Sequence, residues 1–147
     1  MDAATISEEK QVIETECGRL GVLICADSWH QDLYDRLQNP DVIAVPAWIY
    51  PAESWVKQWG GYITTPIPEG VDVKDVNKLT ECDAWHKYSV PTRMKITSAK
   101  VGILSFSNGS MWKDTLGGTS AIYVGGKEYI TQHYRQNQDC LCIMASI

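Results

Sequence analysis

Residues 20–48 read LGVLICADSWHQDLYDRLQNPDVIAVPAW and set the expected fold. The run LGVLIC is continuously apolar, which is typical of a central strand of a sheet. Asp27 and Ser28 are good helix caps, and the two leucines four residues apart in HQDLYDRLQ predict a short amphipathic helix. The tripeptide NPD at 39–41 ends this helix, and VIAVPAW predicts a second strand that ends near Pro46. A strand, a helix and a strand in this order favour a parallel pair joined by a right-handed crossover, and therefore an α/β sheet.

The flanking segments fit the same class. Upstream, QVIETEC at 11–17 alternates apolar and polar residues before Gly18-Arg19, which predicts a half-exposed strand paired as a hairpin with LGVLIC. Gly125-Gly126 predicts a second tight hairpin. The other predicted elements are a Trp-rich helix over 53–60, an irregular stretch over 60–78, and a helical region over 81–100 that is kinked or interrupted at Pro91. Strands are predicted over 101–107, 118–125, 127–134 and 139–147.

Composition and charge exclude several classes of protein. The chain has 147 residues, with 13 Lys and Arg against 18 Asp and Glu and a net charge of −5. This acidic balance argues against nucleic-acid binding as the main role. Its apolar runs fall short of the roughly 20 residues that span a bilayer, and MDAATISEEK lacks the apolar stretch of a secretory signal, so we expect a cytoplasmic protein. An odd count of five cysteines without paired CxxC spacing favours reduced thiols.

The sequence predicts neither a metal ion nor a cofactor. Its three histidines, His30, His86 and His133, are scattered, and Cys140 and Cys142 alone do not complete a four-ligand zinc site. Gly117-Gly118 lacks the spacing and the following lysine of a phosphate-binding loop.

Cys25 has two interpretations from its position alone. It stands where the apolar strand ends and the capped helix begins, a turn that exposes a nucleophile beside backbone N–H groups and favours a thiolate. A free cysteine at the end of an apolar run is also commonly a small buried hydrophobe. Position therefore leaves a catalytic and a structural role open.

Four segments, taken in order, resemble the nitrilase superfamily, the carbon-nitrogen hydrolases. They are TECGRLGVLICADSW (15–29), DVIAVPAW (41–48), KYSVPTRMKITSAKVGILSFSNG (87–109) and GGTSAIYVGGKEY (117–129), so the resemblance covers roughly residues 10 to 130. The first of them is similar to the segment around that family's catalytic cysteine. The resemblance implies a four-layer αββα sandwich and a Glu-Lys-Cys site that needs no cofactor. It favours the catalytic role of Cys25.

The resemblance also implies roles for individual residues. Cys25 matches the nucleophile that attacks a small amide, nitrile or carbamoyl compound, and the N–H of Ala26 is placed to donate to the oxyanion. Trp29 and Trp48 lie where they are expected to shape the substrate pocket, although core or subunit-contact roles remain open for both. Asp27 matches a common family acid, which we interpret as a cap rather than a proton-transfer group.

The chain departs from the family upstream of Cys25. The family's glutamate and lysine lie well before the cysteine, whereas only 24 residues precede it here. Lys10 and the nearby acids match no catalytic motif; these acids are Glu8, Glu9, Glu14 and Glu16. Residues 1–147 therefore resemble the C-terminal portion of one hydrolase domain, half of a sandwich, with 1–9 as a flexible lead-in. We expect it to be inactive alone and to form a homo-oligomer or to associate with an N-terminal half, because half a sandwich leaves apolar surface uncovered.

Two alternatives to the carbon-nitrogen hydrolase stay open. The first is a non-catalytic remnant that serves as a binding or assembly module, with Cys25 retained as part of a packed strand. The second is a different thiol hydrolase in which His86 or His133 pairs with Cys25.

Overall fold

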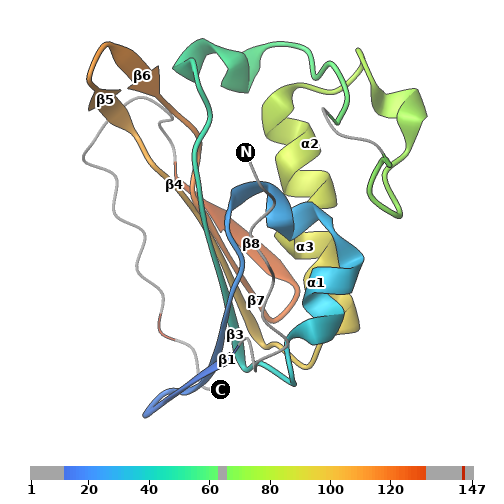
Figure 1. Cartoon of the computed structure of the whole chain (residues 1–147), viewed down its shortest axis with the longest axis vertical. Coiled ribbons are helices and arrows are strands. Elements are labelled where there is room, and N and C mark those ends of the chain that lie inside the picture. The colour runs from blue at the N-terminus through green and yellow to red at the C-terminus, as the bar shows by residue number, and fades with distance from the viewer. Residues whose placement is uncertain (1–11, 63–65, 132–143, 145–147) are drawn as a thin grey trace.

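The computed structural model describes residues 12–62, 66–131 and 144 (Figure 1). Its strands are β1 (Val12–Thr15), β2 (Gly18–Val22), β3 (Val42–Ala47), β4 (Val101–Phe106), β5 (Gly109–Met111), β6 (Asp114–Leu116), β7 (Ala121–Val124) and β8 (Lys127–Ile130). Its α-helices are α1 (Gln31–Arg36), α2 (Glu81–Tyr88) and α3 (Val90–Arg93). Short 3-10 helices cover Cys25–Trp29, Ala52–Val56, Val73–Asp75 and Met94–Ile96.

Six strands form one mixed sheet in the order β1-β2-β3-β4-β7-β8, while β5 and β6 form a separate hairpin. β2 pairs with β3 in parallel, as does β3 with β4, and the remaining neighbours are antiparallel. The predicted α/β class and the parallel pair joined through a helix are therefore confirmed. So is the hairpin of β1 with β2.

Asp41 ties the start of β2 to the start of β3. Its carboxylate accepts a hydrogen bond from the Arg19 N–H at 2.9 Å, and its own N–H donates to the Arg19 carbonyl at 2.8 Å. Gly18 has φ of +108°, and a Cβ at this position would lie 2.8 Å from Asp41 Oδ2. Glycine at position 18 thus permits both the tight turn and the close approach of Asp41.

The capping prediction for α1 is wrong. The N-cap of α1 is His30, and Asp27 and Ser28 lie inside the preceding 3-10 helix. Their side chains form hydrogen bonds within that 3-10 helix and its cap: Ser28 Oγ donates to the Cys25 carbonyl at 2.8 Å, and Asp27 Oδ2 accepts from the Ile24 N–H at 3.4 Å. Both residues stabilise the turn around Cys25.

The predicted helix over 53–60 is mostly absent, because only Ala52–Val56 forms a 3-10 helix. Beyond it the backbone pairs with a distant segment, where the Trp59 N–H donates to the Leu79 carbonyl at 2.9 Å and Gln58 bridges to Thr80. These long-range bonds replace the local bonds that a helix would need.

The helical region over 81–100 is confirmed as two α-helices and a 3-10 turn rather than one kinked helix. Thr80 caps α2 by accepting the Asp83 N–H at 3.1 Å. The chain leaves helical geometry at Ser89, and Pro91 lies in the first turn of α3, where its missing N–H costs nothing. The Gly125-Gly126 hairpin joins β7 to β8 as predicted. The sequence did not predict the β5-β6 hairpin, and the predicted strand over 139–147 lies outside the described residues apart from residue 144.

All three α-helices cover the same face of the sheet (Figure 1). On that face Ile43, Val45 and Leu104 are fully buried. Alternate residues face the other way, and there Val22 is 36% exposed and Ile24 64% exposed. The described chain is therefore a sheet with one helical layer and a second face that keeps exposed apolar side chains.

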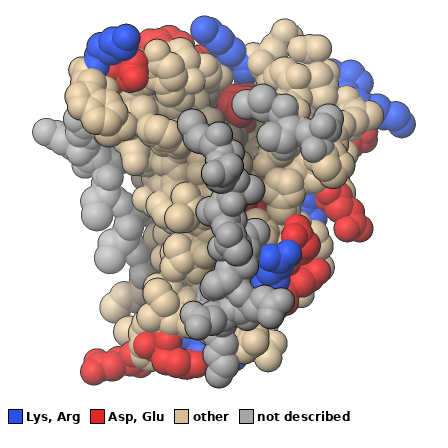
Figure 2. All heavy atoms as spheres, in the orientation of Figure 1, with Lys and Arg blue, Asp and Glu red and all other residues tan. Residues whose placement is uncertain are grey.

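The side of the molecule seen in Figure 2 carries no continuous basic surface. Its Lys and Arg side chains are scattered and adjoin acidic ones. Within the described residues no helix has the length and apolarity needed to cross a membrane.

Candidate functional site

Cys25 occupies a sharp turn directly after β2. The Leu23 N–H still donates to the Ala44 carbonyl at 3.1 Å, as part of the ladder with β3, and two residues later Cys25 has φ of +52°. This left-handed conformation is uncommon and unfavourable for a residue with a Cβ. Such strain persists where the surrounding structure enforces it, and it gathers at functional sites.

The turn places Cys25 at a pocket of about 300 Å³. The lining residues are Cys25, Ala26, Trp29, Trp48, Ile49, Tyr50, Trp59, Gly61, Tyr62, Glu81 and Trp85. All four residues that the sequence pointed to, Cys25, Ala26, Trp29 and Trp48, are thus brought together. This happens because β2 and β3 are parallel neighbours whose carboxyl ends meet at one edge of the sheet.

Cys25 and the following residue, Ala26, both line the pocket. Cys25 is half-buried, and its Sγ lies 3.9 Å from the Trp48 carbonyl oxygen, a weak S–H donor contact. Ala26 is exposed, and no hydrogen bond found among the described residues uses its N–H. A donor beside a sulfur nucleophile is the arrangement that stabilises an oxyanion.

Tyr62 lines the pocket, and its hydroxyl contacts both the Cys25 turn and His30. The Tyr62 hydroxyl donates to the Ala26 carbonyl at 3.1 Å and lies 2.9 Å from His30 Nε2. Because the single hydroxyl proton is used toward Ala26, Nε2 of His30 is the donor in the second bond. The bond to Ala26 joins the segment around Tyr62 to the Cys25 turn.

Glu81 is the one charged side chain among the described residues that line the pocket. It begins α2, and its Oε1 accepts a hydrogen bond from Trp85 Nε1 at 3.1 Å. Burial raises the pKa of Glu81, and the bond from Trp85 opposes this in part. The pocket therefore contains a carboxyl group that is costly to ionise where it stands.

Sequence reasoning missed Glu81, Trp59, Tyr62 and Trp85 as pocket residues. The spacing of Glu81 and Trp85 was a usable signal, because residues four apart share one face of a helix. No local pattern points from Trp59 or Tyr62 to Cys25.

The other sequence candidates lie elsewhere. Glu14 pairs with Arg19 at 3.2 Å on the exposed β1-β2 hairpin, and neither Glu14 nor Glu16 lines the pocket. Lys10, Glu8 and Glu9 lie outside the described residues.

His86 is engaged away from Cys25. Its Nδ1 lies 2.9 Å from the Tyr123 hydroxyl and 2.8 Å from Glu128 Oε1, and its Nε2 lies 3.2 Å from Thr119 Oγ1. His86 does not line the Cys25 pocket, so the geometry gives no support to a pair of Cys25 with His86. His133, the other candidate for that pair, lies outside the described residues.

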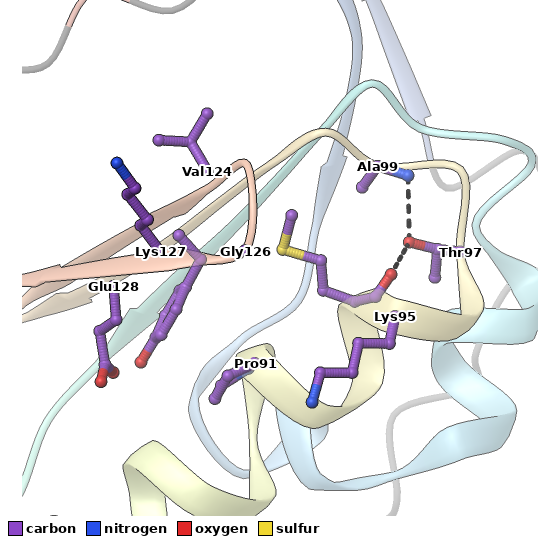
Figure 3. A pocket seen from close by; sticks show the side chains of 10 residues that line it. Pro91, Lys95, Thr97, Ala99, Val124, Gly126, Lys127 and Glu128 are labelled. Carbon is purple, nitrogen blue, oxygen red and sulfur yellow. Dashed lines mark hydrogen bonds between the residues drawn. The ribbon is translucent and has the colours of Figure 1, made fainter.

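A second pocket, of about 330 Å³, lies between α3 with its following turn and the β7-β8 hairpin (Figure 3). Met94 and Tyr123 line it together with Lys95, Lys127 and Glu128. Within the described ranges no three His, Cys, Asp or Glu side chains gather as a metal site. Cys140 and Cys142 lie outside those ranges.

In comparisons with known proteins, the chain matches no family model, no curated protein and no solved structure.

Proposed function

We propose that the chain is the nucleophile-bearing part of a carbon-nitrogen hydrolase of the nitrilase type, acting on a small amide, nitrile or carbamoyl compound. One observation carries this proposal: Cys25 sits in a left-handed turn at the carboxyl end of β2, with its side chain at a pocket and the N–H of Ala26 next to it. A structural cysteine has no need of a strained backbone at a pocket wall.

The proposed reaction on an amide has two steps. Cys25 Sγ attacks the carbonyl carbon of an amide, a C–S bond forms, and the Ala26 N–H stabilises the negative oxygen. The C–N bond then breaks, and the amine leaves with a proton, which gives a thioester. Water attacks the thioester carbon and releases the acid and the thiol. With a nitrile, the C–S bond forms as the nitrogen takes up a proton, which gives a thioimidate and releases no amine. A first water then displaces ammonia to leave the thioester, and a second water releases the acid and the thiol.

The proton transfers in these steps need the glutamate and lysine that the family resemblance implies. No residue of the described chain matches either of them. We propose that a preceding segment or a partner chain supplies both, so that the chain alone is inactive. The same contribution would complete a four-layer sandwich by covering the second face of the sheet.

Sedimentation velocity on the isolated chain tests whether the second face of the sheet associates with another chain. We expect oligomers or aggregates, because Val22 and Ile24 on this face are exposed. Val22→Lys is expected to shift the population toward monomer, since a lysine cannot be buried unpaired in an apolar contact. Ile96→Lys is the control, because Ile96 is equally apolar and exposed but lies outside this face. A clean monomer for the unchanged chain would contradict the half-sandwich.

Cysteine labelling tests the proposed nucleophile. With limiting iodoacetamide near pH 7, we expect Cys25 to react roughly tenfold faster than Cys82. Burial raises the pKa of the Cys82 thiol, which lies 3.9 Å from Thr119 Oγ1. Peptide mapping by mass spectrometry gives the rate at each position, and exposed Cys17 provides the rate of an ordinary accessible thiol. Cys25→Ser should remove the fast phase, and Cys82→Ser should leave it intact.

The same measurement separates the hydrolase from the non-catalytic remnant. A thiol retained only as part of a packed strand would react more slowly than Cys82. That order of labelling would favour a binding or assembly module and count against the nucleophile.

A further inference from the structure

The walls of the Cys25 pocket are unusually aromatic. Of the eleven described residues that line it, six are Trp or Tyr: Trp29, Trp48, Tyr50, Trp59, Tyr62 and Trp85. Several of these rings are fixed against one another, since Trp29 stacks on Trp59 with centroids 5.8 Å apart and meets Trp85 edge-on at 5.3 Å. A rigid aromatic wall offers π-electron faces and edges at little cost in conformational entropy.

The charge of the pocket also bears on which ligand it can bind. Among the described residues that line it, Glu81 is the one charged side chain, and none is a Lys, Arg or His. Nor does any ion pair found among the described residues involve Glu81. The second pocket differs, because Lys95 and Lys127 line it beside Glu128 (Figure 3).

We infer that the aromatic pocket beside Cys25 binds a small organic cation, a quaternary or protonated ammonium group, with Glu81 as its counter-charge. Aromatic rings around an acidic group form the arrangement that recognises such cations, through the negative faces of the rings. Burial raises the pKa of the Glu81 carboxyl, and a bound cation offsets that cost by pairing with the ionised form. No Lys, Arg or His in the described part of the lining competes for that carboxylate.

This inference also narrows the substrate class. If Cys25 is the nucleophile, the substrate is an amide, nitrile or carbamoyl compound that carries a positively charged nitrogen near the reacting carbon. This statement about the substrate rests on the proposed function, whereas the inference that the pocket binds a cation does not. A volume of about 300 Å³ suits a small compound of this kind.

The test compares choline with its uncharged carbon isostere, 3,3-dimethylbutan-1-ol, by titration calorimetry on the unchanged chain. Neither compound has a C–N bond open to hydrolysis by acyl transfer, so binding is measured without turnover. We expect choline to bind about tenfold more tightly than the isostere. Choline should also slow the iodoacetamide labelling of Cys25 and leave that of Cys17 unchanged, because Cys17 lies outside the pocket.

Variants at Glu81 and Trp48 test whether these residues produce the preference for choline. Glu81→Gln keeps an oxygen that can accept the bond from Trp85 Nε1 and removes only the charge, so the preference for choline should disappear. Glu14→Gln, on the exposed β1-β2 hairpin, should keep it. Trp48→Leu removes a lining ring that is half exposed and should weaken choline binding several-fold. Circular dichroism of each variant confirms that it is folded.

Equal affinities for choline and the isostere would overturn the inference, as would binding that neither protects Cys25 nor responds to Glu81→Gln. Failure here is distinguishable from failure of the hydrolase proposal. Rapid labelling of Cys25 without a choline preference would leave the nucleophile and reject the cation. A choline preference with slow labelling of Cys25 would keep the cation site and reject the hydrolase.

Discussion

Replacing Trp29 by alanine is expected to lower the free energy of unfolding by about 3–5 kcal/mol. Trp29 is 2% exposed and contacts four aromatic rings with centroid distances of 5.3 to 5.9 Å. These rings belong to Trp59, Tyr62, Trp85 and Tyr88. The substitution removes the side chain on which they converge and leaves a cavity that rigid neighbours fill poorly. Urea unfolding followed by far-ultraviolet circular dichroism measures the loss.

Two further variants separate the cavity from other effects. Trp112→Ala is the matched control, because Trp112 is 88% exposed, and its cost should stay within about 0.5 kcal/mol. Trp29→Phe keeps an aromatic ring but removes a buried indole Nε1 that has no hydrogen-bond partner among the described residues, so it should cost less than alanine. A loss below about 1 kcal/mol for Trp29→Ala would contradict the central place of this side chain in the core.

The elements that the sequence predicted well are those determined by neighbouring residues. β2, α1 and β3 follow from two apolar runs around an amphipathic segment. The hairpin at Gly125-Gly126 is similar: its turn needs positive φ at two successive positions, and both glycines have it, at 57° and 75°. Local stereochemistry alone specifies that turn.

The elements that were missed or wrong depend on distant partners. The segment after Val56 is extended because it bonds to residues 77–80, and nothing within 53–60 itself signals that partner. The caps of α1 were misassigned for a related reason. Asp27 and Ser28 are typical caps, but their side chains are held by the Cys25 turn, so α1 starts later at Gln31.

The residues of the candidate site also fall into a group that was predicted and a group that depends on distant partners. Cys25 was singled out by its position after an apolar strand, and the family resemblance pointed to Ala26, Trp29 and Trp48. These residues meet because the parallel strands β2 and β3 end side by side. Glu81 and Tyr62 come from segments that reach the pocket through tertiary packing. The acidic, aromatic character that supports a cationic ligand therefore emerges only once the chain has folded.

Replacing Gly118 by alanine is expected to destabilise the fold by about 2–4 kcal/mol, from a steric clash and backbone strain together. Gly118 has φ of +150°, and a Cβ there would lie 2.5 Å from Cδ1 and 2.7 Å from Cβ of Phe106. Phe106 has little room to move away, since its ring centroid lies 4.6 Å from that of Trp55 and 5.1 Å from that of Trp85. Thermal and urea unfolding both report the change.

Two other glycines separate the clash from the strain. Gly126 has positive φ but open space around its Cα, so Gly126→Ala should cost only the strain, about 1 kcal/mol. Gly60 has neither feature, and Gly60→Ala should be close to neutral. If Gly118→Ala costs no more than Gly126→Ala, then Phe106 can shift after all. Trp85 lines the Cys25 pocket and packs on Phe106, so choline affinity in Gly118→Ala should then also change, because a displaced Phe106 moves the pocket wall.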